Sequence, residues 1–589
     1  MTFPRTQSVV TSSAQLPRPT LELAKPLATA PSTVPLRLTF WSVGILLASA
    51  QAWIGRFQVS ADSISYLDMS DGVQRGSDWH LLVNGMYSQL YPFLLGVFRR
   101  IFNISPGNEI AASHLLGVGF FIFAFGCFEF FLVGAARKLE VPDQAHGENQ
   151  TSGPLPKWAF LSVAYSLFLW SAISHIELVV PRADMLLSGF IYLTLGLVLR
   201  MQGRPARWRN YLWLGVVLGV GILAKEAMLP IGCLALASTF FLVQHWRPAV
   251  KMAAVTLAIM VLIGSLYFVP LSLQRGRLTL GDAGKCVYIT NVDQATPHWY
   301  LQDSGSAKGS FLHPPKKIFS DPPAYAFAIP PKVTEPLRFD QSYWMAGVRP
   351  HFVLGRQIAV MKTNLRTFTK LFAELRVVLG TIFVLAFFGG MRQIRSAVLR
   401  AWPVWLIGLA GCMMYAVIWV EPRYVSAFLT LGLIGLLVGL PIPTVTGRKI
   451  AQFAVIATIA ALFIPVAVHV YRTPRPGGNV SLEAARALVS LGVKAGDPVA
   501  RISPSSADLV VERILRSQII AEVDHDRAAE FWSSPLSTQE SLLKEFAAQG
   551  AKVVIATSPK LTAENQSEWS RLGSTEYWAW RPSLQPSSL

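Results

Sequence analysis

The segment ADSISYLDMSD at residues 61–71 places three aspartates directly after an apolar run, LRLTFWSVGILLASAQAWIG. A carboxylate at the boundary between water and lipid can accept a proton from a bound hydroxyl or amine. If the segment is helical, Asp62, Tyr66 and Met69 share a face and Asp71 points the opposite way. Asp62 lies nearest the membrane and is the best candidate for a general base. The alternative is that these acids are solvated or cap the helix.

The composition indicates a membrane protein that crosses the bilayer many times. Of 589 residues, 52% are hydrophobic and 15% are charged, whereas a soluble domain carries about 25% charged residues. Apolar runs of roughly 18 residues or more recur along the chain, and each is long enough to span a bilayer. The first run has no small-residue cleavage site after it, which favours a retained helix over a signal peptide. We therefore expect a mainly α, polytopic helical bundle behind a disordered cytoplasmic leader at residues 1–37.

Eleven membrane spans are expected, at about 38–57, 110–134, 158–174, 185–200, 211–226, 229–244, 252–271, 376–391, 402–420, 424–441 and 450–470. A cytoplasmic N-terminus puts the short basic connections, such as RMQGRPARWRN and MRQIRSAVLR, on one side, as the positive-inside rule requires. This orientation predicts a multi-pass protein of the cytoplasmic (inner) membrane. The net charge of +18 then reflects topology, because the segment after residue 474 nets −1. No nucleic-acid partner is expected.

Three large segments should face the opposite, outer side. They are the loops 58–109 and 272–375, which belong to a transmembrane domain at 38–470, and the tail at 471–589. In the tail, GDPVARIS and AKVVIAT have the character of strands, and SLEAARALVSLGV has helical spacing. This alternation predicts a small extracytoplasmic α/β domain.

Motifs for cofactors are missing from the sequence. The four cysteines form neither CxxC nor a Cys/His cluster with zinc spacing, and we find no P-loop or GxGxxG phosphate motif. We therefore predict no cofactor and no metal site. The acids of the first outer loop could hold a divalent ion, but nothing in their pattern requires one.

The first outer loop resembles that of membrane glycosyltransferases of the GT-C superfamily, which use polyprenyl-phosphate sugars and include protein O-mannosyltransferases and lipid A aminoarabinose transferases. The family pattern runs as an acid, a tyrosine, Gly-Asp-Trp, Asn-Gly-x-Tyr and a Pro-Leu-type segment. The matching residues here are Asp62, Tyr66, Ser77-Asp78-Trp79, Asn84-Gly85-Met86-Tyr87 and Leu90-Tyr91-Pro92. Ser63 and the Gln89-Leu90-Tyr91-Pro92 element depart from it. The resemblance implies that Asp62 is the catalytic base, supported by Tyr66, Trp79, Asn84 and Tyr87.

Three further segments fit the same family: VPRADMLLSGFIYLTL (180–195), GVGILAKEAMLP (219–230) and EPRYVSAF (421–428). The resemblance implies that Asp184 orients the acceptor or supports the base, and that Lys225, Arg423 and Tyr424 bind the donor phosphate. The alternatives are an N-cap role for Asp184, a snorkelling or acid-paired Lys225, and neutralisation of Arg423 by Glu421.

The implied reaction is an inverting transfer of a hexose or pentose from a polyprenyl phosphate to a lipid, glycan or protein acceptor at the outer membrane face. Two other classes stay open. A flippase or transporter of lipid-linked saccharides would also carry basic residues facing a phosphate. A ligase or polymerase of the O-antigen type would use outer-loop residues such as Arg349, His351 and Arg356. Convergence of Asp62 and Lys225 in the fold would favour the transferase.

Overall fold

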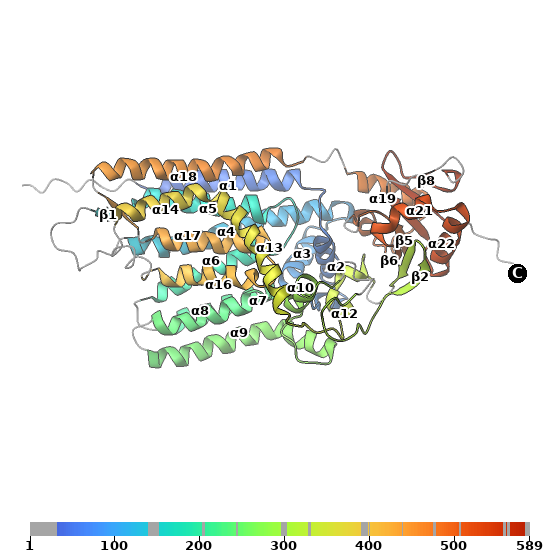
Figure 1. Ribbon diagram of the computed structural model, residues 1–589, viewed down its shortest axis with the longest axis horizontal. Helices are drawn as coiled ribbons and strands as arrows, with labels where there is room; N and C mark the ends of the chain where they lie inside the picture. The colour runs from blue at the N-terminus through green and yellow to red at the C-terminus, as the bar shows by residue number, and fades with distance from the viewer. Residues whose placement is uncertain are drawn as a thin grey trace, which may run out of the picture.

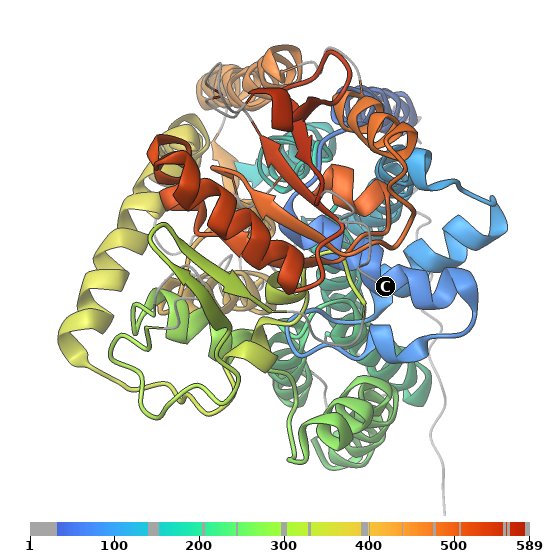
Figure 2. The same ribbon diagram turned by 90° about the vertical axis from the view of Figure 1, so that its right-hand side faces the viewer.

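The computed structural model has a bundle of long helices at one end and a small mixed sheet at the other (Figure 1). Seen along the long axis from the sheet end, the strands and their helices lie in front of the bundle (Figure 2). The structure describes residues 32–139, 152–202, 207–242, 246–295, 303–327, 332–389, 399, 401–438, 440–443, 445–474, 479–505, 508–557, 561 and 566–582. The predicted leader lies almost wholly outside these residues.

Eleven helices of the described chain coincide with the eleven expected ranges and run roughly along the long axis (Figure 1). They are α1 (Val34–Ile54), α4 (Glu109–Leu139), α5 (Lys157–Leu169) with its continuation η3 (Trp170–Ile176), α6 (Asp184–Met201), α7 (Trp208–Ala224), α8 (Met228–Leu242), α9 (Trp246–Arg275), α14 (Arg376–Gly389), α16 (Trp402–Ala416), α17 (Pro422–Leu437) and α18 (Val445–Arg472). Among the residues that the structure describes, five helices are long and apolar enough to cross a membrane, and five more are apolar but shorter. The count of eleven spans stays a prediction.

Two glycines allow α6 to pack closely against α4. A Cβ atom on Gly189 would lie 2.5 Å from a ring carbon of Phe123, and one on Gly196 would lie 2.4 Å from a ring carbon of Phe130. Small residues at such contacts let helices approach within a lipid environment, where dispersion contacts replace the hydrophobic effect. This packing holds α6, whose first residue is Asp184.

The first outer loop folds into α2 (Ala61–Arg75), η1 (Trp79–Leu82), α3 (Leu90–Ile101) and η2 (Pro106–Asn108). A reciprocal capping box begins α2, in which the Ser60 and Ser63 side chains each accept from the other's backbone N–H. The helix ends at Gly76, whose positive φ of 72° favours glycine. The expected helix over ADSISYLDMSD is therefore present, and its cap is Ser60 instead of an aspartate.

The long loop and the tail build one sheet together. The loop forms α10 (Ala283–Asn291), β2 (Lys316–Ser320), β3 (Pro323–Ala326), α11 (Pro336–Phe339), α12 (Gln341–Trp344) and α13 (Leu354–Glu374). The tail forms α19 (Val480–Ser490), β5 (Val499–Ile502), α20 (Val510–Ile514), β6 (Ile519–Val523), η4 (His525–Arg527), α21 (Ala528–Ser533), α22 (Leu536–Ala548), β7 (Val553–Thr557), η5 (Gln566–Glu568), β8 (Ser570–Arg571) and β9 (Tyr577–Trp580). The strand order is β2-β3-β6-β5-β7-β9-β8.

Within this sheet β5 pairs in parallel with both β6 and β7, while β3 joins β6 antiparallel. The sheet therefore extends beyond the predicted tail domain and takes two strands from the loop. A separate two-stranded sheet pairs β1 (Ser152–Pro154) with β4 (Pro441–Pro443).

A buried cluster of charges joins the tail to α2. Its members are three arginines and three carboxylates, namely Asp68, Asp71, Arg99, Glu109, Arg513 and Arg516. Arg513 of α20 contacts Asp68 at 2.5 Å and Asp71 at 2.7 Å. This arrangement contradicts the alternative of a solvated acidic turn for these two residues, because arginines from a distant part of the sequence compensate their charge.

The sheet end of the molecule should become more stable as the pH falls from about 8.5 to 6. Burial raises the pKa of Glu512 to about 7 and that of Glu522 to about 8, whereas unfolded glutamate titrates near about 4.3. A raised folded-state pKa means that the folded protein binds more protons, so each group lowers the stability by up to about 1.4 kcal/mol per pH unit as the pH rises toward its folded pKa, and by no more above it. Thermal unfolding across this pH range measures the effect. The variant Glu522→Gln should flatten the profile, and an equally steep profile in that variant would contradict the assignment.

Candidate active site at the sheet-facing end of the bundle

Asp62 lies in the first turn of α2 with its side chain partly exposed to solvent. The Tyr87 hydroxyl donates to Asp62 Oδ1 at 2.8 Å. Burial, followed by the charge of Asp62, raises the pKa of Tyr87 well above its ordinary value, so the phenol stays a proton donor. The Tyr66 ring packs against the Tyr87 ring with centroids 5.0 Å apart. The Asp62 side chain is 38% exposed, which leaves it open to a substrate.

Asn84 fixes the turn that delivers Tyr87 to Asp62. Its side-chain oxygen accepts from the backbone N–H of Met86 and of Tyr87 at 2.8 and 3.0 Å. Its amide nitrogen donates to the carbonyl of Phe339 in α11. Asn84 is fully buried, so these bonds satisfy groups that water cannot reach. The first outer loop and the long loop are joined at this residue.

Asp184 and Lys225 form a close pair beside Asp62. Asp184 begins α6 and is only 7% exposed, and Lys225 follows the last residue of α7. Their Nζ–Oδ1 distance is 2.5 Å. The N-cap of α6 is Ala183, so Asp184 does not cap the helix with its side chain. Lys225 therefore has the acid partner that the sequence left as an alternative.

Arg423 connects the two aspartates from the start of α17. Its Nη2 lies 3.8 Å from Asp62 Oδ2, and its Nη1 lies 3.7 Å from Asp184 Oδ2. Its Nε donates to Glu421 at 2.5 Å. The contacts to the aspartates exceed hydrogen-bond length, whereas the contact to Glu421 is a short charge-assisted bond. Glu421 thus partly neutralises Arg423, as the sequence alternative proposed.

Tyr424 lies against both cations. Lys225 Nζ is 4.3 Å from the centre of the Tyr424 ring, and the Arg423 guanidinium carbon is 4.7 Å from it. The Tyr424 hydroxyl also accepts from Arg423 Nη2 at 2.9 Å. The Tyr415 ring stacks on the Tyr424 ring with 5.1 Å between centroids. An aromatic face attracts cations, so Tyr424 holds Lys225 and Arg423 in place.

The fold therefore brings together eight of the nine predicted site residues: Asp62, Tyr66, Asn84, Tyr87, Asp184, Lys225, Arg423 and Tyr424. Trp79 is the exception. It lies in η1 with 50% of its surface exposed, and within the described residues no hydrogen bond or ring contact joins it to the other eight. The sequence reasoning missed Tyr415, which has no polar signal in its apolar run.

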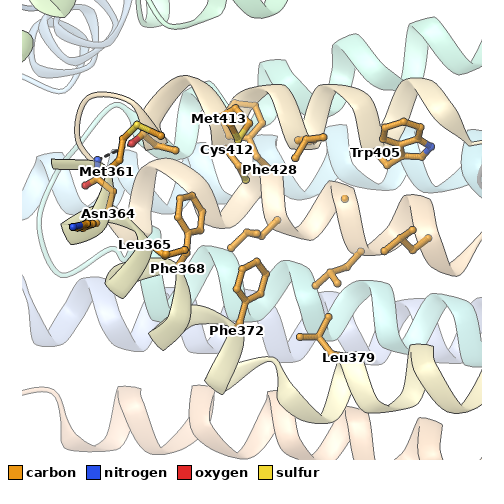
Figure 3. A pocket seen from close by; sticks show the side chains of 18 of the residues that line it. Met361, Asn364, Leu365, Phe368, Phe372, Leu379, Trp405, Cys412, Met413 and Phe428 are labelled. Carbon is orange, nitrogen blue, oxygen red and sulfur yellow. Dashed lines mark hydrogen bonds between the residues drawn. The ribbon is translucent and has the colours of Figure 1, made fainter. Parts of the chain in front are cut away.

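An apolar groove opens beside this site between α13, α16 and α17, with a volume of about 770 Å³. Figure 3 shows Leu365, Phe368 and Phe372 of α13 facing Cys412 and Phe428. The groove approaches the charged site through Tyr415, whose ring lies 6.4 Å from that of Phe428 and stacks on Tyr424. Its lining is suited to a long hydrocarbon chain.

The loop residues expected of a ligase lie elsewhere. His351 and Arg356 bind Asp293, the first through its backbone N–H and the second through a guanidinium bond to the Asp293 carbonyl. Arg349 pairs with Lys308 through the backbone. All of these contacts stay within the long loop. Over the described ranges, no group of three or more His, Cys, Asp or Glu side chains is placed to hold a metal ion.

Comparison with known proteins gives likenesses of structure only. No family model matches the sequence, and no curated protein matches it. ArnT from Cupriavidus metallidurans bound to undecaprenyl phosphate overlaps 93% of this chain and 98% of its own, with 13% identity and a TM-score of 0.42. The Archaeoglobus fulgidus oligosaccharyltransferase overlaps 88% of this chain and 68% of its own, with 13% identity and a TM-score of 0.45. The mycobacterial arabinofuranosyltransferase AftD overlaps 90% of this chain but 35% of its own, with 13% identity and a TM-score of 0.45. Likeness at this level leaves the assignment of function to the residues themselves.

Proposed function

We propose that the protein is an integral-membrane glycosyltransferase that moves a sugar from a polyprenyl-phosphate donor to an acceptor at the outer face of the membrane. The observation that carries this proposal is the convergence of Asp62, Asp184, Lys225 and Arg423 beside an apolar groove. A general base, cations for a phosphate and a cleft for a lipid chain are the three parts that such a transfer needs. Both cations come from helices far from the first outer loop in sequence.

Asp62 is the better candidate for the base. Its carboxylate is accessible, and its nearest cation is 3.8 Å away. Asp184 is almost buried and is held by Lys225 at 2.5 Å, which stabilises its ionised form and weakens it as a base. Asp62 would take the proton of the acceptor hydroxyl or amine while the acceptor atom bonds to the anomeric carbon. The bond from that carbon to the phosphate oxygen breaks, and polyprenyl phosphate leaves with the electron pair.

Lys225 and Arg423 would stabilise the negative charge that develops on the leaving phosphate. The guanidinium has five N–H groups, and Arg423 uses two of them in short bonds to Glu421 and Tyr424. The remaining ones face Asp62 and Asp184 at distances too long for hydrogen bonds. A phosphate oxygen between the two aspartates could therefore bind Arg423 without displacing Glu421.

The groove lined by α13, α16 and α17 would hold the isoprenoid tail of the donor. A branched hydrocarbon gains roughly 25 cal/mol for each Å² of apolar surface removed from water. Tyr415 and Tyr424 stand between this groove and the two cations. A tail in the groove would place the phosphate at the charged end.

Replacing Lys225 or Arg423 by alanine is expected to reduce sugar transfer by about 10-fold or more, because a charge-assisted hydrogen bond of about 1.5–3 kcal/mol is lost. The measurement is transfer of label from radiolabelled polyprenyl-phosphate sugars in membranes, with lipid, glycan and protein fractions separated. Lys544→Ala is a matched control, because Lys544 is 76% exposed on α22 and should leave transfer unchanged. Wild-type kinetics in both Lys225→Ala and Arg423→Ala would assign these residues to helix packing.

A further inference from the structure

The charges of the proposed site do not favour an anion as they stand. Lys225 and Arg423 face three carboxylates, those of Asp62, Asp184 and Glu421. Two cations among three acids leave an excess of negative charge, and a phosphate would be repelled by it. A third cation is needed close to Asp184 if a phosphate is to bind there.

Arg182 is such a cation, two residues before Asp184 in the connection that leads into α6. The positive charge of Arg182 acts on the Asp184 carboxylate, together with the charges of Lys225 and Arg423. Its Nε is buried and has no hydrogen-bond partner. Across the described residues, no ion pair or hydrogen bond engages its guanidinium. A buried, unsatisfied donor on a charged group costs free energy, and a ligand anion would satisfy it.

The backbone around Arg182 is fixed toward the start of α2. The hydroxyl of Ser63, the residue after Asp62, donates to the carbonyl of Pro181 at 2.8 Å. Pro181 and Ala183 on either side of Arg182 are buried. The backbone at Arg182 is therefore held against the start of α2, and its side chain is close enough for its charge to act on Asp184.

We infer that Arg182 is a direct binding residue for the phosphate of the lipid substrate, and that it adds a third cation with an unsatisfied donor to Lys225 and Arg423. The inference rests on the proposed function and adds a residue to its donor site. Arginine suits this task because its planar fork gives two parallel hydrogen bonds to a phosphate. Bound phosphate would meet three cations against three carboxylates, so the local excess of negative charge disappears.

Binding of undecaprenyl phosphate, compared with binding of the uncharged undecaprenol, tests the inference on the detergent-purified full chain. Wild type should bind the phosphate more tightly than the alcohol. The variant Arg182→Gln should weaken phosphate binding by about 10–100-fold, since a charged hydrogen bond is lost, and leave undecaprenol binding unchanged. The phosphate affinity of Arg182→Lys should lie between those of wild type and Arg182→Gln, because the ammonium keeps the charge but lacks the two parallel N–H groups of a guanidinium. Inorganic phosphate, added as a competitor, distinguishes recognition of phosphate alone from recognition that needs the lipid chain.

Arg472→Gln serves as the matched control, because Arg472 is exposed at the end of α18 and its loss removes the same charge. Equal unfolding temperatures of the variants separate lost binding from lost folding, and partial recovery in Arg182→Lys does so independently. If wild type prefers the phosphate and Arg182→Gln keeps the full preference, the role of Arg182 is wrong while the proposed function survives. If wild type binds undecaprenol as tightly as its phosphate, both are wrong.

Discussion

Replacing Asp62 by asparagine is expected to reduce kcat for sugar transfer by about 10²–10⁴-fold, the usual contribution of a general base. The amide keeps the size of the side chain and can still accept the bond that Tyr87 donates at 2.8 Å, but it takes no proton from an acceptor. Donor binding should change little, because the nearest Arg423 nitrogen is 3.8 Å from Asp62. The measurement is initial rate at saturating donor, with equal amounts of folded protein.

Asp78→Asn is the control for this prediction, since Asp78 is an exposed acid of the same loop and should be dispensable. Asp71→Asn differs from both, because Asp71 lies in the buried charge cluster. Any loss of activity in Asp71→Asn should follow the folded fraction and disappear when rates are divided by it. High activity in Asp62→Asn together with a dead Asp184→Asn would move the base to Asp184.

Most helices could be predicted because their apolar runs are long and end at polar or basic residues. The eleven expected ranges each contain a helix, and Gly76 and Ser60 limit α2 through ordinary cap chemistry. The sheet was harder to predict. The strand β3 is PAYA in a proline-rich loop, and it pairs with β6 about 200 residues later. No local sequence pattern predicts that pairing, because each strand is short and its partner strand is far away in the sequence.

In the site, too, single residues could be predicted from local motifs, whereas pairings between distant residues could not. Resemblance to a family and residue type indicated Asp62, Asp184, Lys225 and Arg423, and the fold brings them into contact. Sequence gave no reason to expect that Asp68 and Asp71 would find Arg513 in the tail, because partners more than 400 residues apart leave no spacing to read. Arg182 could not be predicted from the sequence for a different reason. Its proposed role depends on a buried Nε without a hydrogen-bond partner, and this can be recognised only in the folded structure.

Removing the Arg513 side chain, as in Arg513→Met, is expected to lower the free energy of unfolding by about 3–5 kcal/mol, the cost of leaving the buried Asp68 carboxylate without its arginine. Arg513 is only 1% exposed and contacts Asp68, Asp71 and Glu109 at 2.5, 2.7 and 2.7 Å. Burial raises the pKa of Asp68 to about 6 even beside this arginine, so its loss would leave an acid that is strained at neutral pH. Thermal unfolding of the purified protein measures the change.

Arg527→Gln is the matched control, because Arg527 lies in the same part of the chain, is 46% exposed and pairs with the exposed acids Asp321 and Glu530. A change within about 0.5 kcal/mol is expected there. Lowering the pH should partly rescue Arg513→Met, since protonation of Asp68 removes the uncompensated charge. An Arg513→Met protein that unfolds at the wild-type temperature would mean that the cluster does not hold the tail to α2. The prediction matters for catalysis, because the same helix presents Asp62 at its first turn, and a loosened α2 would displace the proposed base without any change at the site itself.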